Sequence, residues 1–334
     1  MTIENEAIWG MRDLSKDNHW QRINLEDYLS DKPVVVCFGG NGTTSEEEAN
    51  GICKFVENHL HLLFSENGKN NVYDYVDIIS AAYPTDEKSK KGKLTKDDIE
   101  NFVDNFLIKL IEDENDELLP LNEACRKLSQ VTFFSFCSGH HEVDRIMRAF
   151  YKELKVLGYS QQERDVLMFS TFEVSYAPLT YSSLIPAMFV DSKQDEMLNS
   201  GWKNNETASK QDEKLNGVAV KYERYGDPLM SGLAVSEAIF DAIHVYSSRL
   251  RNNIDGDEHN LALLSRDGDW NARYEPNADC VSQMMAWVLS RAVENGIDNK
   301  NSKKFIPKMP LEELLKEVES IKNGFSEEQL MSKQ

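Results

Sequence analysis

Apolar and polar positions along this chain follow two patterns in turn. Short apolar runs, typical of strands that are buried on both faces, precede longer segments with apolar residues at helical spacing. The runs predict strands at 34–38, 75–83, 131–136, 165–172, 185–190 and 218–222. The helical spacing predicts helices at 45–63, 95–112, 121–128, 143–154, 233–250 and 278–293. Because predicted strands and helices alternate, we expect an α/β fold with a mostly parallel sheet and helices on both faces.

This pattern predicts a single doubly wound domain over residues 34–296, an ordinary size for one core. Residues 1–33 are polar with scattered aromatic residues, and they predict an N-terminal cap with one short edge strand. Residues 193–216 hold few apolar side chains and predict a solvated insertion in the domain. Residues 297–334 predict a linker and a short amphipathic helix at 311–321, which could dock onto the domain or onto a protein partner.

The segment 131–154 joins a predicted buried strand to a predicted helix through Ser135-Phe136-Cys137-Ser138-Gly139. Small residues two positions before and after Cys137 have the spacing of a nucleophile elbow, because bulky side chains there would collide with the neighbouring strand and helix. Such a turn would place Cys137 at the sheet edge, where helix N–H groups and the helix dipole favour a thiolate. Two alternatives stay open. Cys137 could be an ordinary small core residue, or Ser138 could be the nucleophile, which fits the small-residue pattern less well.

In a parallel sheet, ligands bind beyond the carboxyl ends of the strands. The residues that the pattern places at that edge are Gly39–Gly42, Tyr83, Cys137, Phe172–Tyr176 and Asp191. Their convergence is the strongest functional signal in the sequence.

The order of these motifs resembles that of the α/β-hydrolase superfamily over roughly residues 34–293. In that family an oxyanion loop follows an early strand, then come a nucleophile elbow, an acid after a later strand and a histidine before the last helix. The matching positions here are Gly39-Gly40-Asn41, Cys137, Asp191 and His259. A cysteine at the elbow is similar to dienelactone-hydrolase-like members. The resemblance implies hydrolysis or acyl transfer on an ester, thioester or related carbonyl substrate, with no cofactor.

The expected chemistry assigns a role to each of these residues. Cys137 attacks a carbonyl carbon, His259 takes and returns a proton, and Asp191 orients the imidazole. The oxyanion would bind the backbone N–H groups of Ser138 and of either Gly40 or Asn41. Two alternatives stay open here as well, because Asp191 could cap the next helix and His259 could be a surface residue.

Further residues are expected to line the site without a defined role. They are Gly39, Gly42, Tyr83, His140, His141 and Tyr176. The two histidines lack a third ligand for zinc, and Asp255-Gly256-Asp257 lacks the closing glutamate of a calcium loop. No metal is therefore expected.

Two other function classes are alternatives. The stretch Gly39-Gly40-Asn41-Gly42-Thr43, followed by Asn50-Gly51, looks like the phosphate-binding Gly-Gly-Asp-Gly-Thr loop of diacylglycerol and NAD kinases. That resemblance implies a nucleotide or lipid kinase. A catalytically silent α/β-hydrolase-like protein that binds a ligand or a partner is the other alternative.

Composition narrows the partners. The chain has 57 acidic and 37 basic residues and a net charge of −20, which disfavours binding to nucleic acid or anionic membranes. Its five cysteines are isolated, which is typical of a reducing compartment. The sequence shows no secretory signal pattern and no apolar run of membrane-span length. We therefore expect a cytoplasmic protein that acts on a small-molecule or acyl substrate, although specialised secretion would leave no such signal.

Overall fold

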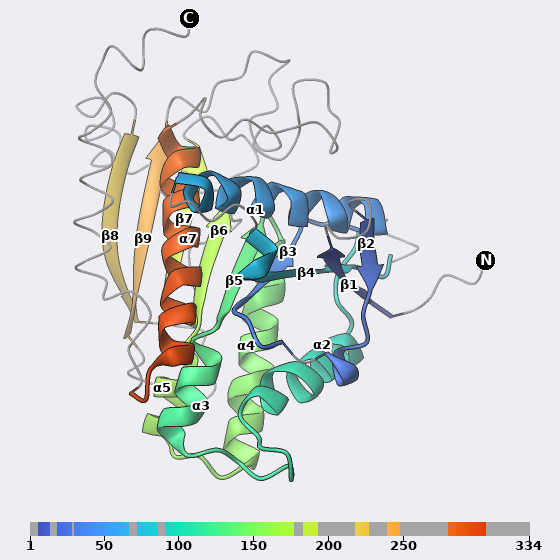
Figure 1. The fold of residues 1–334 in the computed structure, drawn as a ribbon, viewed down its shortest axis with the longest axis vertical. Helices are drawn as coiled ribbons and strands as arrows, with labels where there is room; N and C mark the ends of the chain where they lie inside the picture. The colour runs from blue at the N-terminus through green and yellow to red at the C-terminus, as the bar shows by residue number, and fades with distance from the viewer. Residues whose placement is uncertain are drawn as a thin grey trace, which may run out of the picture.

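The computed structural model describes residues 6–13, 19–28, 30–66, 72–85, 91–176, 183–192, 218–226, 239–247 and 280–304. These residues form one nine-stranded sheet with helices on both faces, so the predicted α/β class is confirmed (Figure 1).

The sheet has the strand order β2-β1-β4-β3-β5-β6-β7-β9-β8. In chain order the strands are β1 (Ile8–Asp13), β2 (His19–Arg22), β3 (Val34–Phe38), β4 (Asp77–Ala82), β5 (Val131–Phe136), β6 (Phe172–Tyr176), β7 (Ala187–Ser192), β8 (Val218–Gly226) and β9 (Ile239–Ser247). The strands from β4 to β9 along this order pair in parallel. Strand β1 is antiparallel to both β2 and β4, and β8 is antiparallel to β9.

Two apolar clusters, one on each face, fix the helices to the sheet. One face is covered by α1 (Glu46–Glu66) and α7 (Cys280–Asn301), which lie together over the strands in Figure 1. The other face is covered by α2 (Lys96–Phe102), the π-helical η3 (Val103–Ile108), α3 (Leu121–Leu128), α4 (Gly139–Val156) and α5 (Gln161–Phe169). Side chains alternate across β5, so that Phe133 packs in one cluster and Phe134 in the other. Two short 3-10 turns, η1 (Leu25–Asp27) and η2 (Val72–Asp74), complete the elements.

The topology creates a switch point between β3 and β5. From β3 the chain passes through α1 to β4 on one side, and it later returns to β5 on the other side. The connections that leave the carboxyl ends of β3 and β5 therefore turn to opposite faces, towards α1 and α4. Ligand sites of open α/β sheets lie in the crevice at such a point.

Several predicted elements are confirmed. The strands at 34–38 and 131–136 and the helix at 121–128 have the predicted bounds. A capping box formed by Ser45 and Glu48 stands at the start of α1. Glu48 N donates to Ser45 Oγ at 3.2 Å, and Ser45 N donates to the Glu48 carboxylate at 3.0 Å.

Two predicted elements are wrong. Most of the strand expected at 165–172 is the end of α5, because Ser160 and Glu163 form a capping box that starts a helix, and its apolar residues Leu167 and Met168 pack in the core. The helix expected at 233–250 contains β9 instead, which pairs with β7 on one side and β8 on the other. The apolar residues of this segment recur about every four positions, and this spacing did not distinguish a helix from a strand.

Other bounds differ from the predictions. The N-terminal segment contributes two strands rather than one, and α7 runs to Asn301, eight residues beyond the predicted end at Val293. The predicted insertion 193–216 and the predicted helix 311–321 lie outside the described residues. Within the described ranges, no helix combines the length and the apolar character of a membrane span.

Candidate functional site

The turn between β5 and α4 has the backbone conformation of a strained elbow. Strand β5 ends at Phe136 and α4 begins at Gly139, which leaves only Cys137 and Ser138 for the reversal. Cys137 has a φ of 55°, in the left-handed region that residues with a side chain rarely adopt. Such a conformation costs about 1–3 kcal/mol and persists only where the surroundings fix it. A strained strand-to-helix turn is the geometry that exposes the nucleophile in elbow motifs.

Gly139 shows why the elbow needs a small residue after Cys137. A Cβ atom at Gly139 would lie 2.2 Å from the carbonyl oxygen of Phe38 and 2.7 Å from that of Gly39. The start of α4 therefore lies directly on the backbone at the end of β3. The sequence predicted that a larger side chain would collide here. In the structure, the atoms it would meet are the carbonyl oxygens of Phe38 and Gly39 at the end of β3.

Gly40 lies beside the cysteine side chain. A Cβ atom at Gly40 would lie 3.3 Å from Cys137 Cβ and 3.7 Å from Cys137 Sγ. In the part of the chain that the structure describes, the backbone N–H groups of Gly40 and Ser138 have no hydrogen-bond acceptor. The structure thus brings together the thiol, the glycine loop and two N–H groups of the kind that an oxyanion would require.

Tyr83 supports the glycine loop from the end of β4. Its Oη donates a hydrogen bond to the carbonyl of Gly39 at 2.9 Å, and its backbone N–H donates to Thr43 O at 2.8 Å. Tyr83 is buried, and burial raises the pKa of its phenol well above the ordinary value, so the hydroxyl remains a donor. Tyr83 therefore holds the loop in place rather than lining an open site.

The N-terminus of α1 does not provide a free phosphate cradle. The Glu48 carboxylate accepts hydrogen bonds from the backbone N–H groups of Thr44 at 2.8 Å and Ser45 at 3.0 Å. The first turn of α1 also carries Glu46 and Glu47, whose charges repel a phosphate. This arrangement disfavours the kinase alternative. Farther along the loop, Asn41 is half-buried and Gly42 is exposed.

Cys137 differs in its exposure from the three other cysteines whose side chains the structure describes. Its residual exposed fraction is 8%, against 0% for Cys37 and Cys53 and 1% for Cys125. Its side chain also joins the apolar cluster under α1 and α7. Cys137 is therefore a buried residue that keeps a small exposed fraction at the carboxyl edge of the sheet.

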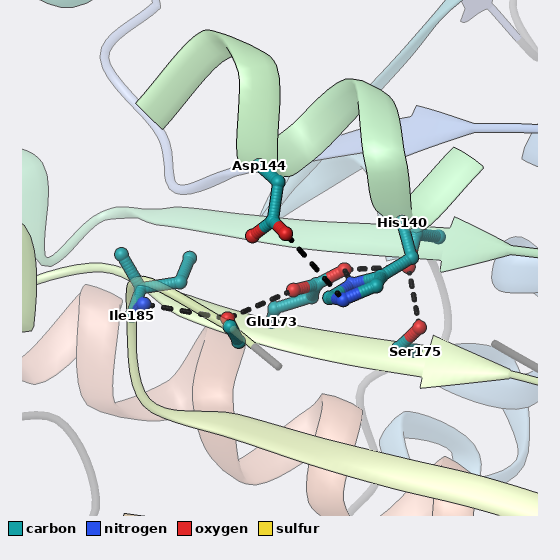
Figure 2. Close-up of polar contacts among 7 residues, drawn as sticks. His140, Asp144, Glu173, Ser175 and Ile185 are labelled. Carbon is teal, nitrogen blue, oxygen red and sulfur yellow. Dashed lines mark hydrogen bonds and ion pairs between the residues drawn. The ribbon is translucent and has the colours of Figure 1, made fainter. Parts of the chain in front are cut away.

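The two histidines of α4 are placed differently from each other. His140 is fully buried, with Nδ1 2.9 Å from Glu173 Oε1 and Nε2 3.9 Å from Asp144 Oδ2, so both ring nitrogens face carboxylates (Figure 2). His141 is half-buried. Its pKa is lowered by burial and by the nearby His140, and Glu173 partly opposes this shift. His140 thus lies within the core beneath the elbow.

The remaining predicted residues lie on the strands beyond β5. Tyr176 ends β6, is buried, and accepts a hydrogen bond from Cys137 N at 3.0 Å through its carbonyl. Phe172 begins β6 and so lies at the opposite edge, which corrects the prediction that 172–176 lies wholly at the carboxyl edge. Asp191 lies near the carboxyl end of β7, two strands from β5. His259 lies outside the described residues.

A buried polar cluster beneath the elbow was missed in the sequence. Glu173 is fully buried on β6, and its carboxylate contacts Ser135 and His140. The signal in the sequence is the alternation in Phe172-Glu173-Val174-Ser175-Tyr176, because polar residues two apart in a buried strand share one face. Polar side chains that are fully buried require hydrogen-bond partners.

Comparison with known proteins gives no family assignment. A scan against protein-family models and a search of curated proteins found no match to this chain. Among the described residues, no group of three metal-ligating side chains is assembled. The elbow and the glycine loop are therefore the features that carry the functional argument.

Proposed function

We propose that this protein is an enzyme of the α/β-hydrolase type that hydrolyses or transfers an acyl group through Cys137. The observation that carries the proposal is the left-handed backbone of Cys137, at the strand-to-helix turn and against Gly40. A side chain held in this way at a switch point is unusual for an ordinary core cysteine, because the strain is avoided by any residue that only fills space.

The arrangement of the sheet supports the resemblance to the α/β-hydrolase superfamily. That family places antiparallel strands before the strand that precedes the oxyanion loop. Here β1 and β2 come before β3, and β1 is antiparallel to β4. The elbow follows on β5, the next strand across the switch point.

The reaction begins with attack of the Cys137 thiolate on the carbonyl carbon of the substrate. A carbon–sulfur bond forms, and the carbonyl electron pair moves to the oxygen, which the N–H groups of Gly40 and Ser138 would bind. Collapse of this intermediate expels an alcohol or thiol, which takes up a proton, and leaves an acyl-thioester on Cys137. Water or a second acceptor then removes the acyl group. In this proposal His259 takes the proton of the Cys137 thiol and returns it to the leaving group. Asp191 orients the imidazole of His259.

The experiment measures turnover of chromogenic acyl esters and thioesters by the wild type, Cys137→Ala and His259→Ala. A matched control is Cys125→Ala, which removes a buried cysteine on α3, in the apolar cluster on the other face of the sheet from Cys137. We expect wild-type turnover that falls on the order of 10³-fold in Cys137→Ala and is nearly unchanged in Cys125→Ala.

Wild-type turnover that survives in Cys137→Ala would refute the assignment of the nucleophile. No turnover of any substrate by a folded wild type would favour the alternative of a silent, ligand-binding protein.

A further inference from the structure

A buried carboxylate and four other polar side chains form a cluster beneath the elbow. This group, the Glu173 cluster, consists of Ser135, His140, Glu173, Ser175 and Ser183. Ser135 Oγ donates to Glu173 Oε1 at 2.6 Å, and His140 Nδ1 lies 2.9 Å from the same oxygen. Ser183 Oγ donates to Glu173 Oε2 at 3.3 Å, and the hydroxyls of Ser135 and Ser175 share a hydrogen bond of 2.8 Å. Figure 2 shows the Glu173 carboxylate beside the His140 ring.

The positions of these partners in the chain define what the cluster connects. Ser135 lies on β5, two residues before Cys137, and His140 lies in the first turn of α4, three residues after it. A single carboxylate oxygen therefore joins the two segments that enter and leave the elbow. The other oxygen reaches Ser183, whose Oγ accepts from the backbone N–H of Ile185 just before β7.

The cluster is a polar group within a largely apolar core. Apolar side chains of β5, β6 and α4 already pack on both faces of the sheet, including Phe133, Phe134 and Val174. A fully buried carboxylate is costly unless it is hydrogen-bonded, so an apolar side chain at this position would be the simpler choice for stability alone. Hydrogen bonds to a charged acceptor are also roughly twice as strong as neutral ones, which suits a group that must fix a geometry.

We propose that Glu173 is a positioning residue for the Cys137 nucleophile, an inference that rests on the proposed acyl-transfer function. Glu173 holds Ser135 and His140 at a fixed separation, and this maintains the left-handed conformation of Cys137 between them. Without the carboxylate, the elbow relaxes and the thiol leaves the N–H groups of Gly40 and Ser138. Glu173 itself does not touch the substrate.

The test compares Glu173→Gln, Glu173→Leu and Ser135→Ala with the wild type. Glutamine keeps an acceptor oxygen and loses the charge, and leucine removes the acceptor. Ser135→Ala removes the hydroxyl that donates to Glu173 Oε1. The matched control is Ser170→Ala. Ser170 is equally buried, and its hydroxyl donates to Val166 O at 2.8 Å outside the cluster. The first measurement is kcat and KM for an acyl ester, with unfolding midpoints in urea as the measure of stability.

We expect kcat to fall at least about tenfold in Glu173→Leu and Ser135→Ala, with KM within about twofold of wild type, because the loss concerns the transition state. Glu173→Gln should recover part of the lost kcat. Ser170→Ala should lose stability while kcat stays unchanged. If Ser135→Ala and Glu173→Gln keep the wild-type kcat and lose only as much stability as Ser170→Ala, the cluster is merely structural and the inference is wrong.

A second measurement does not depend on enzyme activity. Native protein is treated briefly with iodoacetamide, and the peptide that contains Cys137 is quantified by mass spectrometry. We expect alkylation of Cys137 to be at least about threefold slower in Glu173→Gln and Ser135→Ala, because the thiolate is the reactive form and loses its N–H donors. Equal or faster alkylation contradicts the inference. An inactive wild type with slower alkylation in the variants would instead reject the acyl-transfer function and leave the positioning role standing.

Discussion

The substitution Gly139→Ala tests the elbow without changing any chemical group. Gly139 is the first residue of α4, and its added methyl group would lie 2.2 Å from the carbonyl oxygen of Phe38. Contacts of this kind below 3.0 Å essentially do not occur, so the two segments must separate by about 0.8 Å. The opposing atoms are backbone atoms at the end of β3, which is held by parallel pairing to β4 and β5.

The expected cost follows from these contacts. Overpacking of a core costs about 1–3 kcal/mol, and a backbone neighbour that cannot rotate away places this case at the upper end. Alanine is favoured over glycine in a helix by about 1 kcal/mol, which offsets part of the cost. We expect Gly139→Ala to lower the free energy of unfolding by about 2 kcal/mol or more.

The assay is urea unfolding followed by circular dichroism, in which a lower midpoint at constant slope reports stability. The matched control is Gly42→Ala, because a methyl group there meets no atom within 4 Å, and its change should stay within about 0.5 kcal/mol. A second control, Gly158→Ala, has a φ of 93° and no neighbour, so it measures backbone strain alone, about 1 kcal/mol. Equal stability of Gly139→Ala and Gly42→Ala would refute the close contact between α4 and β3.

Three further substitutions test the surroundings of the thiol. Gly40→Ala should cost less than about 1 kcal/mol of stability. It should lower kcat/KM for acyl esters at least about tenfold, because its methyl group would lie 3.7 Å from Cys137 Sγ. An unchanged kcat/KM would mean that the substrate binds elsewhere. Tyr83→Phe should lower the free energy of unfolding by about 1–3 kcal/mol, because the carbonyl of Gly39 loses its hydrogen-bond donor. The assay is urea unfolding, and an unchanged midpoint would show that this hydrogen bond does not stabilise the fold. The pKa of His141 is lowered from its ordinary value of 6.5, so the folded state binds fewer protons than the unfolded state and loses stability as the pH falls below that value. In His141→Gln this loss should be absent, and parallel pH profiles of the two proteins would contradict the burial of the imidazole.

The local features of the elbow could be predicted from the sequence because they depend on neighbouring residues. The run 131–136 is rich in β-branched and aromatic residues, which indicates a buried strand. The small residues two positions before and after Cys137 match the steric requirement of a tight turn. Both predictions needed only the residue types of the run and the size of a Cβ atom. The meeting of Gly40 and Cys137 followed from the rule that parallel strands end at one edge.

The segments 165–172 and 233–250 were assigned wrongly because their local sequence fits more than one element. Val166 to Phe169 is a short apolar run, and such runs fit a buried strand or a buried helix equally well. The capping signal at Ser160 and Glu163 decides for the helix, and it was present in the sequence. The strand β9 could not be recognised in this way, because its pairing with β7 and β8 joins segments that are far apart in the chain.

The Glu173 cluster depends on long-range register and could not be derived from neighbouring residues. Glu173 and Ser135 are 38 positions apart, and they meet because Ser135 pairs with Ser175 across β5 and β6. The alternation of polar residues in β6 indicates that they share a face, but it does not identify what lies opposite. Only the strand order places His140 there as well.

The central claim, that Cys137 accepts an acyl group, is tested most directly by trapping the intermediate. The protein is mixed with an activated thioester, quenched in acid within seconds, digested and analysed by mass spectrometry. We predict the mass of the acyl group on the peptide that contains Cys137, its absence from that peptide in Cys137→Ser, and much slower acylation in a denatured sample. Acylation of Cys137 no faster than that of Cys37, Cys53 and Cys125 in the unfolded chain would contradict the account.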